Sequence, residues 1–97
     1  MKIQISSEAA AWYKKELSLN TGDFVRFYVR YGGYSPVQKG FSLGISSDEP
    51  NDIGAKTTED GITFYVEEKD LWYFDEHDLV VTYHVKYDEP VLDYKKS

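Results

Sequence analysis

Apolar and polar residues alternate most clearly over residues 24–31 of this 97-residue chain. Val25, Phe27, Val29 and Tyr31 fall on one face of a predicted strand, and the residues between them fall on the other. The same pattern predicts further strands at 2–5, 41–45, 55–58, 62–66 and 79–87, with an edge segment at Val91-Leu92. Pro90 is expected to end the strand at 79–87, and residues 95–97 to form a polar tail.

Over residues 8–17 the apolar residues recur with the period of a helix instead of alternating. Ala9, Tyr13 and Leu17 form an apolar stripe, and Ser6 or Ser7 is a suitable N-cap. Residues 69–74 predict one more helical turn, anchored by Leu71, Trp72 and Phe74. One helix and about six short strands joined by turns indicate an α+β or mainly β fold with a mostly antiparallel sheet. The length predicts a single domain, residues 1–97.

Composition narrows the classes of function. The hydrophobic fraction of 41% and aromatic fraction of 16% favour a folded chain with an aromatic core. The net charge of −6 argues against binding to nucleic acid or to an anionic membrane. The chain has no cysteine, which excludes disulfides, thiolate nucleophiles and cysteine-ligated clusters. No apolar run is long enough for a membrane helix, so we expect a soluble, cytoplasmic protein.

A double glycine interrupts the pattern after the strand at 24–31. Gly32 and Gly33 permit positive φ angles and close backbone approach, and Tyr34-Ser35-Pro36 continues as a loop. Such a loop either exposes backbone N–H groups to an anion or serves only as a tight exit from the strand. It is not a Walker loop, because the Gly-Lys-Ser/Thr ending is missing.

The stretch Gly32-Gly33-Tyr34-Ser35-Pro36 resembles the signature loop of the HesB/IscA family, the A-type iron–sulfur carriers. The predicted layout also matches that family over nearly the whole chain: a strand, a helix opened by residues 6–10, the signature loop and a hairpin around Gly61. The resemblance implies a HesB/IscA-like fold. In the family a cysteine follows the double glycine and a Cys-Gly-Cys motif lies near the C-terminus. Here Tyr34 takes the first position and the second has no counterpart, so we expect no cluster, no metal and no other cofactor.

Two further features of the sequence are candidate binding sites. Arg26 and Arg30 share a strand face with Phe24 and Tyr28, so they could grip a carboxylate or phosphate, or simply pair with acids on a solvated face. His77 lies among acidic residues at 75–78, which suggests either a metal site or a solvated turn.

His84 is read as a structural histidine in the long strand. The chain contains neither a calcium-loop spacing nor a nucleophile elbow.

Three hypotheses of function follow. The first is a non-catalytic binding or interaction module, working through Gly32, Gly33, Tyr34 and Ser35 with Arg26 and Arg30, whose partner is a protein or a small anionic ligand. The second is a small-ligand or metal-dependent enzyme that uses the arginine face or the His77 cluster. The third is a structural subunit of a homo-oligomer, paired through its tyrosine-rich strands. We favour the first, and expect no enzymatic activity.

Overall fold

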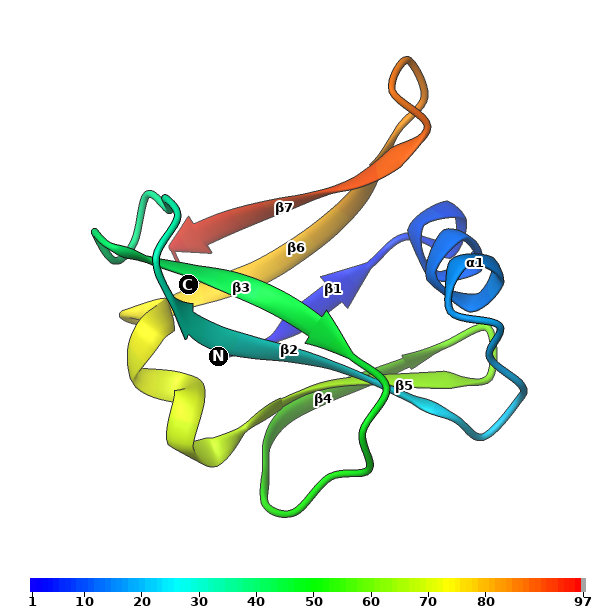
Figure 1. The fold of residues 1–97 in the computed structure, drawn as a ribbon, viewed down its shortest axis with the longest axis horizontal. Helices are drawn as coiled ribbons and strands as arrows, with labels where there is room; N and C mark the ends of the chain where they lie inside the picture. The colour runs from blue at the N-terminus through cyan, green and yellow to red at the C-terminus, as the bar shows by residue number, and fades with distance from the viewer. Residues whose placement is uncertain (97) are drawn as a thin grey trace.

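The computed structural model describes residues 1–96, and Figure 1 shows their arrangement. In chain order the elements are β1 (Ile3–Ile5), α1 (Ser7–Glu16), β2 (Phe24–Tyr31), β3 (Phe41–Ser46), β4 (Ile53–Glu59), β5 (Ile62–Glu67), the 3-10 helix η1 (Glu68–Phe74), β6 (His77–His84) and β7 (Glu89–Lys96). No helix within these residues has the length and apolar character needed to cross a membrane.

The strands form two sheets, ordered β3-β2-β5-β4 and β1-β6-β7. The neighbours β2–β3, β4–β5 and β6–β7 pair antiparallel, whereas β2–β5 and β1–β6 pair parallel. The α+β class and the mostly antiparallel pairing are therefore confirmed, but the strands form two sheets rather than one, and each sheet contains one parallel pair. Residues 1–96 contain seven strands in two mixed sheets, and a 3-10 helix besides α1. Both parallel pairs join segments far apart in sequence, so no turn signal announces them.

The N-terminus of α1 resolves a choice that the sequence left open. Ser6 is the N-cap, because its Oγ accepts a hydrogen bond from the backbone N–H of Ala9 at 3.1 Å. Ala9, Ala10 and Tyr13 are buried against the sheets, as the predicted apolar stripe requires. The helix thus covers the core with the face that the spacing of apolar residues indicated.

Aromatic rings form the centre of the core. Tyr13 contacts Phe27 and Phe64 edge-on, with ring centroids 6.0 and 5.8 Å apart, and Phe27 stacks on Phe64 at 6.3 Å. Such pairs add to the stabilisation that the buried area itself provides. Burial raises the pKa of the Tyr13 phenol to about 12. The three rings come from α1, β2 and β5, so they join the helix to the four-stranded sheet.

The β6–β7 hairpin differs from the sequence prediction in the end of its first strand and in the place of Pro90. The alternation to Tyr87 is misleading, because β6 ends at His84 and residues 85–88 form a turn in which Val85 and Tyr87 are exposed. Pro90 does not end a strand but lies within β7, opposite Tyr83. Proline is tolerated there because β7 is an edge strand, where a missing N–H costs no ladder bond.

β7 also extends the edge segment predicted at residues 91–92 in both directions. It includes Lys95 and Lys96, for which a polar tail was expected, while Ser97 lies outside the described residues.

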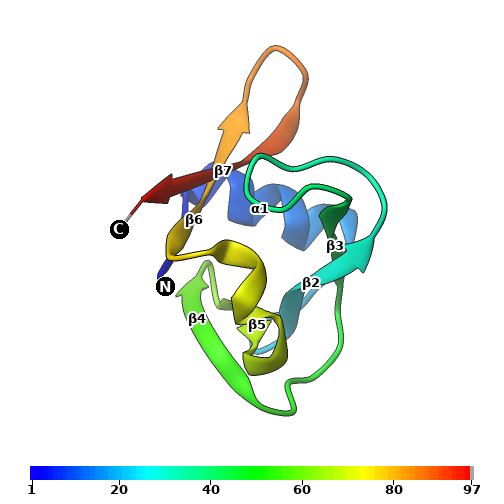
Figure 2. The same cartoon turned by 90° about the vertical axis from the view of Figure 1, so that its left-hand side faces the viewer.

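The helical turn predicted at 69–74 is confirmed as η1, which follows β5 and lies beside β4, β5 and β2 (Figure 2). Phe74 is a buried anchor as expected, but Trp72 is 51% exposed. Tyr73 was not predicted as an anchor, yet it is fully buried and its hydroxyl lies 2.8 Å from that of Tyr94. η1 therefore links the core to an aromatic ring at the surface.

Candidate functional site

The glycine loop between β2 and β3 is closed at its neck. The Gly32 N–H donates to the Gly40 carbonyl at 2.7 Å, and the Ser42 hydroxyl donates to the Gly32 carbonyl at 2.9 Å. Gly33 has a φ of 75°, and a Cβ on it would lie 2.7 Å from Ser42 Oγ. The double glycine thus has a local structural reason, since a side chain at Gly33 would combine backbone strain with crowding.

Within this loop the polar and aromatic candidates have different environments. Ser35 is buried, and its Oγ accepts from the Gln38 N–H at 3.1 Å and lies 3.3 Å from the Gln38 carbonyl. It therefore shapes the loop from inside. Tyr34, in contrast, is 82% exposed. Of the residues predicted at this loop, Tyr34 is the one whose side chain is available to a partner.

Arg26 and Arg30 do not form a shared anion-binding site. The Arg26 Nη2 lies 3.3 Å from Asp70 Oδ2, and its guanidinium lies over the Tyr28 ring at 5.7 Å. The Arg30 Nε donates to Ser42 Oγ at 3.1 Å, at an exposed position. The two side chains share a strand face, as the alternation predicted, but they have separate partners.

The Asp70 carboxylate stabilises β2 beyond the point where its pairing with β5 ends. The parallel pairing of β2 with β5 covers Phe24 to Arg26. Beyond it the Asp70 carboxylate accepts from the Val29 N–H at 3.3 Å as well as from Arg26. The buried carboxylate thus replaces a strand partner for β2 and neutralises one arginine.

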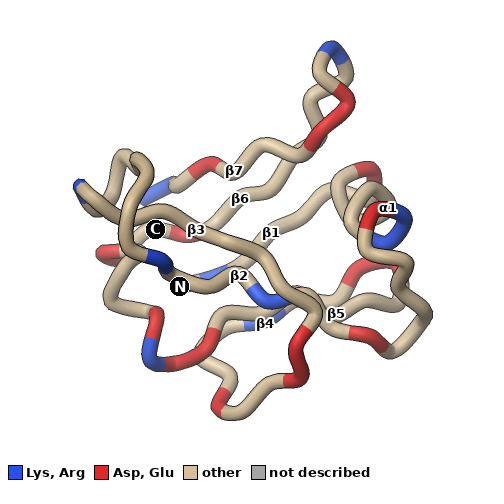
Figure 3. Tube along the Cα trace, viewed as in Figure 1, with Lys and Arg blue, Asp and Glu red and all other residues tan. Residues whose placement is uncertain are grey.

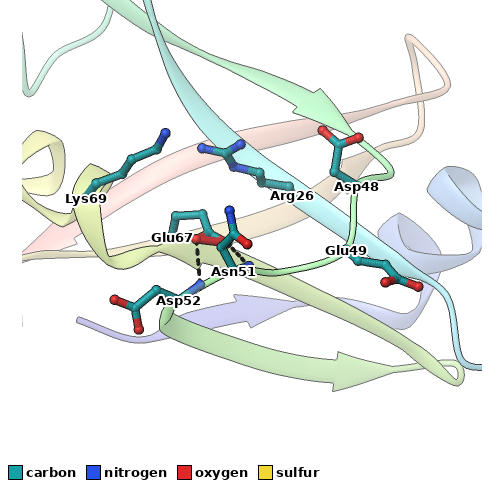
Figure 4. A pocket seen from close by; sticks show the side chains of 7 residues that line it. All are labelled: Arg26, Asp48, Glu49, Asn51, Asp52, Glu67 and Lys69. Atoms are coloured by element: carbon teal, nitrogen blue, oxygen red, sulfur yellow. Dashed lines mark hydrogen bonds between the residues drawn. The ribbon is translucent and has the colours of Figure 1, made fainter.

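A polar pocket of about 410 Å³ lies on the Arg26 side of β2, and sequence reasoning did not find it (Figure 4). Its lining residues are Arg26, Asp48, Glu49, Asn51, Asp52, Glu67 and Lys69. Arg30 is not among them, so the pocket contains one of the two arginines that share this strand face. The pocket exists because the loop after β3 folds back over the end of β5, a long-range contact without a local sequence signal.

Glu67 holds that loop in place. Its two carboxylate oxygens accept the backbone N–H groups of Asn51 and Asp52, each at 2.8 Å. The bond from Asn51 first, then that from Asp52, holds the pKa of the Glu67 carboxyl below its ordinary value of 4.5, against the effect of burial. The buried Tyr65 supports the same loop by donating to the Asp48 carbonyl at 2.7 Å, and burial raises its pKa.

The histidines do not form a metal centre. His77 Nδ1 lies 3.0 Å from the Phe74 carbonyl and 2.8 Å from that of Asp75, which makes Nδ1 the protonated nitrogen. His84 is exposed and stacks on Tyr87 at 4.7 Å. In residues 1–96 no group of three or more His, Cys, Asp or Glu could hold a metal ion. The His77 cluster therefore lacks the convergent ligands that a metal-dependent enzyme would need there.

Three aromatic residues, Tyr31, Phe41 and Trp72, form a row at the end of the β2–β3 hairpin; we call it the aromatic row. Tyr31 meets Phe41 edge-on at 5.7 Å between centroids, and Phe41 meets Trp72 at 5.3 Å. Trp72 in turn lies 6.3 Å from the buried Tyr73. Tyr31 shares the strand face of the buried Val25 and Phe27, but it lies beyond the core and is 89% exposed.

Comparison with known proteins confirms the resemblance that the glycine loop carried. The family model described as iron–sulphur cluster biosynthesis matches residues 1–96, so the chain belongs to this family. It is 57% identical over 95 residues to a Bacillus subtilis protein named pyruvate dehydrogenase inhibitor, covering 98% of this chain and 100% of that one.

An uncharacterized protein of Staphylococcus saprophyticus is 44% identical over 84% of this chain and 86% of its own. One of Staphylococcus haemolyticus is 37% identical over 84% of this chain and 85% of its own.

The residues present do not fit the cluster that the family description implies. The chain has no cysteine, and the signature position is occupied by the phenol of Tyr34. Thiolates bind iron as soft, charged ligands, which a phenol, a neutral and hard oxygen donor, does not replace. The membership therefore describes shared ancestry and shape rather than cluster chemistry.

Proposed function

We propose that this protein is a non-catalytic regulator that acts by binding another protein, and that its target is pyruvate dehydrogenase. The observation that carries this proposal is the 57% identity, over essentially the whole of both chains, to a relative named for inhibiting that enzyme. An inhibitor that acts by binding needs a complementary surface and no reactive group. The absence of every cysteine from a member of an iron–sulphur family is consistent with such a change of role.

The end of the β2–β3 hairpin is the proposed working surface. Tyr34 and Tyr31 project from it, and the hydrogen bonds between Gly32, Gly40 and Ser42 hold it in one conformation. Exposed tyrosines on a preorganised support are typical of binding surfaces, because little entropy is lost when they are covered. A cytoplasmic location and a single domain belong to the same proposal.

The test is inhibition of purified B. subtilis pyruvate dehydrogenase complex. Increasing amounts of this protein should lower the rate of NADH formation to a plateau, with the 57% identical relative as positive control. Heat-denatured protein at the same concentration serves as the negative control. If the relative inhibits and this protein neither inhibits nor binds the complex, the proposal is wrong. Sedimentation of the protein alone tests the separate hypothesis of a homo-oligomer.

A further inference from the structure

In residues 1–96 four strands form the edges of the two sheets, and three of them carry features that discourage pairing with another chain. β1 has only three residues, β4 contains Lys56 and a register shift between Ile53 and Ala55, and β7 contains Pro90 and several charges. Short length, charge, proline and bulges are the usual protection of an exposed edge, because its unpaired N–H and C=O groups otherwise accept a further strand.

β3 is the edge strand that lacks this protection. Its six residues, Phe41–Ser46, include no charge and no proline, and its register with β2 is unbroken. Figure 3 shows β3 tan along its length, whereas β4 and β7 carry coloured charged positions. Among the strands of residues 1–96 it pairs with β2 alone, and its Ile45 is 38% exposed. The outer side of β3 is therefore suited to pairing with another strand.

Two hydrogen bonds show which backbone groups of β3 point away from β2. The Gly32 N–H donates to the Gly40 carbonyl across the hairpin, whereas the Val29 N–H donates to Asp70 on the other side of β2. Bonded and non-bonded pairs alternate along an antiparallel ladder. The even-numbered residues of β3 therefore bond to β2, and the odd-numbered residues direct their N–H and C=O groups outward.

Leu43 and Ile45 supply the outward groups that a further strand can use. The third odd-numbered residue, Phe41, already donates its N–H to the Gln38 carbonyl at 3.2 Å. Residues that face each other in a hydrogen-bonded antiparallel pair exchange both of their N–H···O bonds. A strand whose own outward groups have the same spacing therefore satisfies both Leu43 and Ile45.

We propose that this strand is β3 of a second copy of the protein, paired antiparallel about a two-fold axis at Gly44. In this register Leu43 of each copy lies opposite Ile45 of the other, so all of their outward groups are bonded. The two side chains lie on the same face of the strand, and the axis keeps the faces of both copies on one side. The exposed Ile45 is then covered by an apolar neighbour.

The face of β3 opposite Ile45 is covered by an aromatic ring from β2. A Cβ added to Gly44 would lie 2.5 Å from Cζ of Tyr28, so this ring lies directly over Gly44. Since Gly44 is at the axis, the Tyr28 rings of the two copies approach each other there. Aromatic pairs across neighbouring strands stabilise antiparallel pairing.

The charges at the two ends of β3 favour a second copy in the antiparallel direction. Lys39 lies two residues before the strand, and Asp48 lies two residues after it, where its carboxylate accepts a hydrogen bond of 3.0 Å from the Ser46 hydroxyl. Antiparallel pairing brings the Lys39 end of each copy beside the Asp48 end of the other, whereas parallel pairing places like charges together. The dimer does not rest on the proposed function.

The first experiment measures the mass of the protein by sedimentation equilibrium from about 1 µM to about 1 mM. The natural protein should become dimeric as its concentration rises. Ile45→Lys gives β3 the charge that protected edges carry, so it should raise the dissociation constant about tenfold or more. The matched control is Val85→Lys, at an 83% exposed site in the β6–β7 turn, which should dimerise like the natural protein. Thermal unfolding verifies that both variants are folded.

A natural protein that stays monomeric throughout this range overturns the proposal, as does a dimer that Ile45→Lys leaves unchanged. If the natural protein is monomeric and Ile45→Lys abolishes its binding to pyruvate dehydrogenase complex, the edge pairs with a strand of that target, which also overturns the second copy.

Hydrogen exchange locates the contact. The amides of Leu43 and Ile45 should exchange more slowly as the concentration rises, whereas those of Ser42 and Gly44, which are bonded to β2 in monomer and dimer alike, should not change. Protection that grows with concentration only at other residues would place the contact on another surface and overturn the pairing of β3.

A charge exchange tests the direction of pairing. Lys39→Glu and Asp48→Lys should each weaken self-association, because each places like charges at both ends of the paired strands. An equal mixture of the two variants should dimerise again, since opposite charges then meet at both ends. A mixture that associates no better than either variant alone would overturn the antiparallel arrangement.

Discussion

The β2–β3 and β6–β7 hairpins both present tyrosines to solvent, but they support them differently. Tyr31 belongs to a row of rings that reaches the buried Tyr73 through Phe41 and Trp72. Tyr87, which is 63% exposed, stacks on His84 and lies under the Lys86 ammonium of its own turn. The difference teaches that exposure alone does not define a binding surface. A ring is a useful anchor when the core fixes it in place.

The two turns also achieve their backbone geometry by different means. The β2–β3 loop uses Gly32 and Gly33 at φ of 104° and 75°. The β6–β7 turn places the non-glycine Asp88 at φ of 53°. Aspartate tolerates the left-handed region better than most residues, whereas the crowding at Gly33 leaves no room for a side chain.

The largest expected effect tests the core support of the aromatic row. Tyr73→Ala should lower the free energy of unfolding by about 3–5 kcal/mol, as is typical of a deleted buried ring. Tyr87→Ala should change it by less than about 0.5 kcal/mol, because that ring lies at an exposed tip. Urea denaturation of both variants measures the contrast. Equal losses for the two tyrosines would break the comparison.

The loop that follows the first hairpin should be sensitive to pH through Glu67. Glu67→Gln should cost roughly 1–3 kcal/mol, because the carboxamide can no longer accept both the Asn51 and the Asp52 N–H groups. The folded pKa lies below the unfolded 4.5, so the carboxylate stabilises the fold above about pH 4.5 and this contribution is lost as the pH falls through the folded value.

Denaturation at several pH values should therefore show the natural protein losing its advantage over Glu67→Gln toward acid. Glu16→Gln, exposed on α1, is the control and should run parallel to the natural protein. A constant difference between Glu67→Gln and the natural protein at every pH would contradict the role assigned to the charge.

The glycine loop offers a smaller test of the two turns. Gly33→Ala should cost about 1–2 kcal/mol because it combines a left-handed backbone with contact to Ser42. Gly32→Ala measures the cost of the left-handed backbone alone, since nothing lies within 4 Å of its added Cβ. Asp88→Gly in the other turn should stay within about 0.5 kcal/mol of the natural protein. Thermal unfolding ranks the three, and a Gly33→Ala variant no less stable than Gly32→Ala would remove the crowding argument.

The smallest effect concerns the tie between the second hairpin and α1. The Trp12 indole N–H donates to the Asp88 carbonyl at 2.9 Å. Trp12→Phe keeps most of the ring and removes this bond, so we expect a loss of about 0.5–1.5 kcal/mol, near the lower end because the bond is exposed. Hydrogen exchange should quicken at the Asp88 amide, which donates to Val85, and not in β2. Faster exchange in both hairpins would show that the two are not independent.

Local chemistry in the sequence determined much of this protein. The alternation at Phe24–Tyr31, a helix cap at Ser6 or Ser7 and the turn before Ile62 each follow from adjacent residues, and the structure has a strand, a cap at Ser6 and a turn at these places. The glycine loop predicted the family as well as a turn, and the missing cysteines excluded the family's cluster chemistry. These features rest on backbone sterics and side-chain type, which act over a few residues.

The tertiary structure alone decided which distant residues meet. It separated the partners of Arg26 from those of Arg30, placed Pro90 inside an edge strand and left Tyr31 exposed on a strand face that is otherwise covered by the core. It also formed the Glu67 pocket and joined Tyr31, Phe41 and Trp72 in one row. These outcomes depend on the parallel pairing of β2 with β5 and on the path of η1 beside β2. A period in the sequence tells which side of a strand a residue faces, but not what lies on that side or where the core ends.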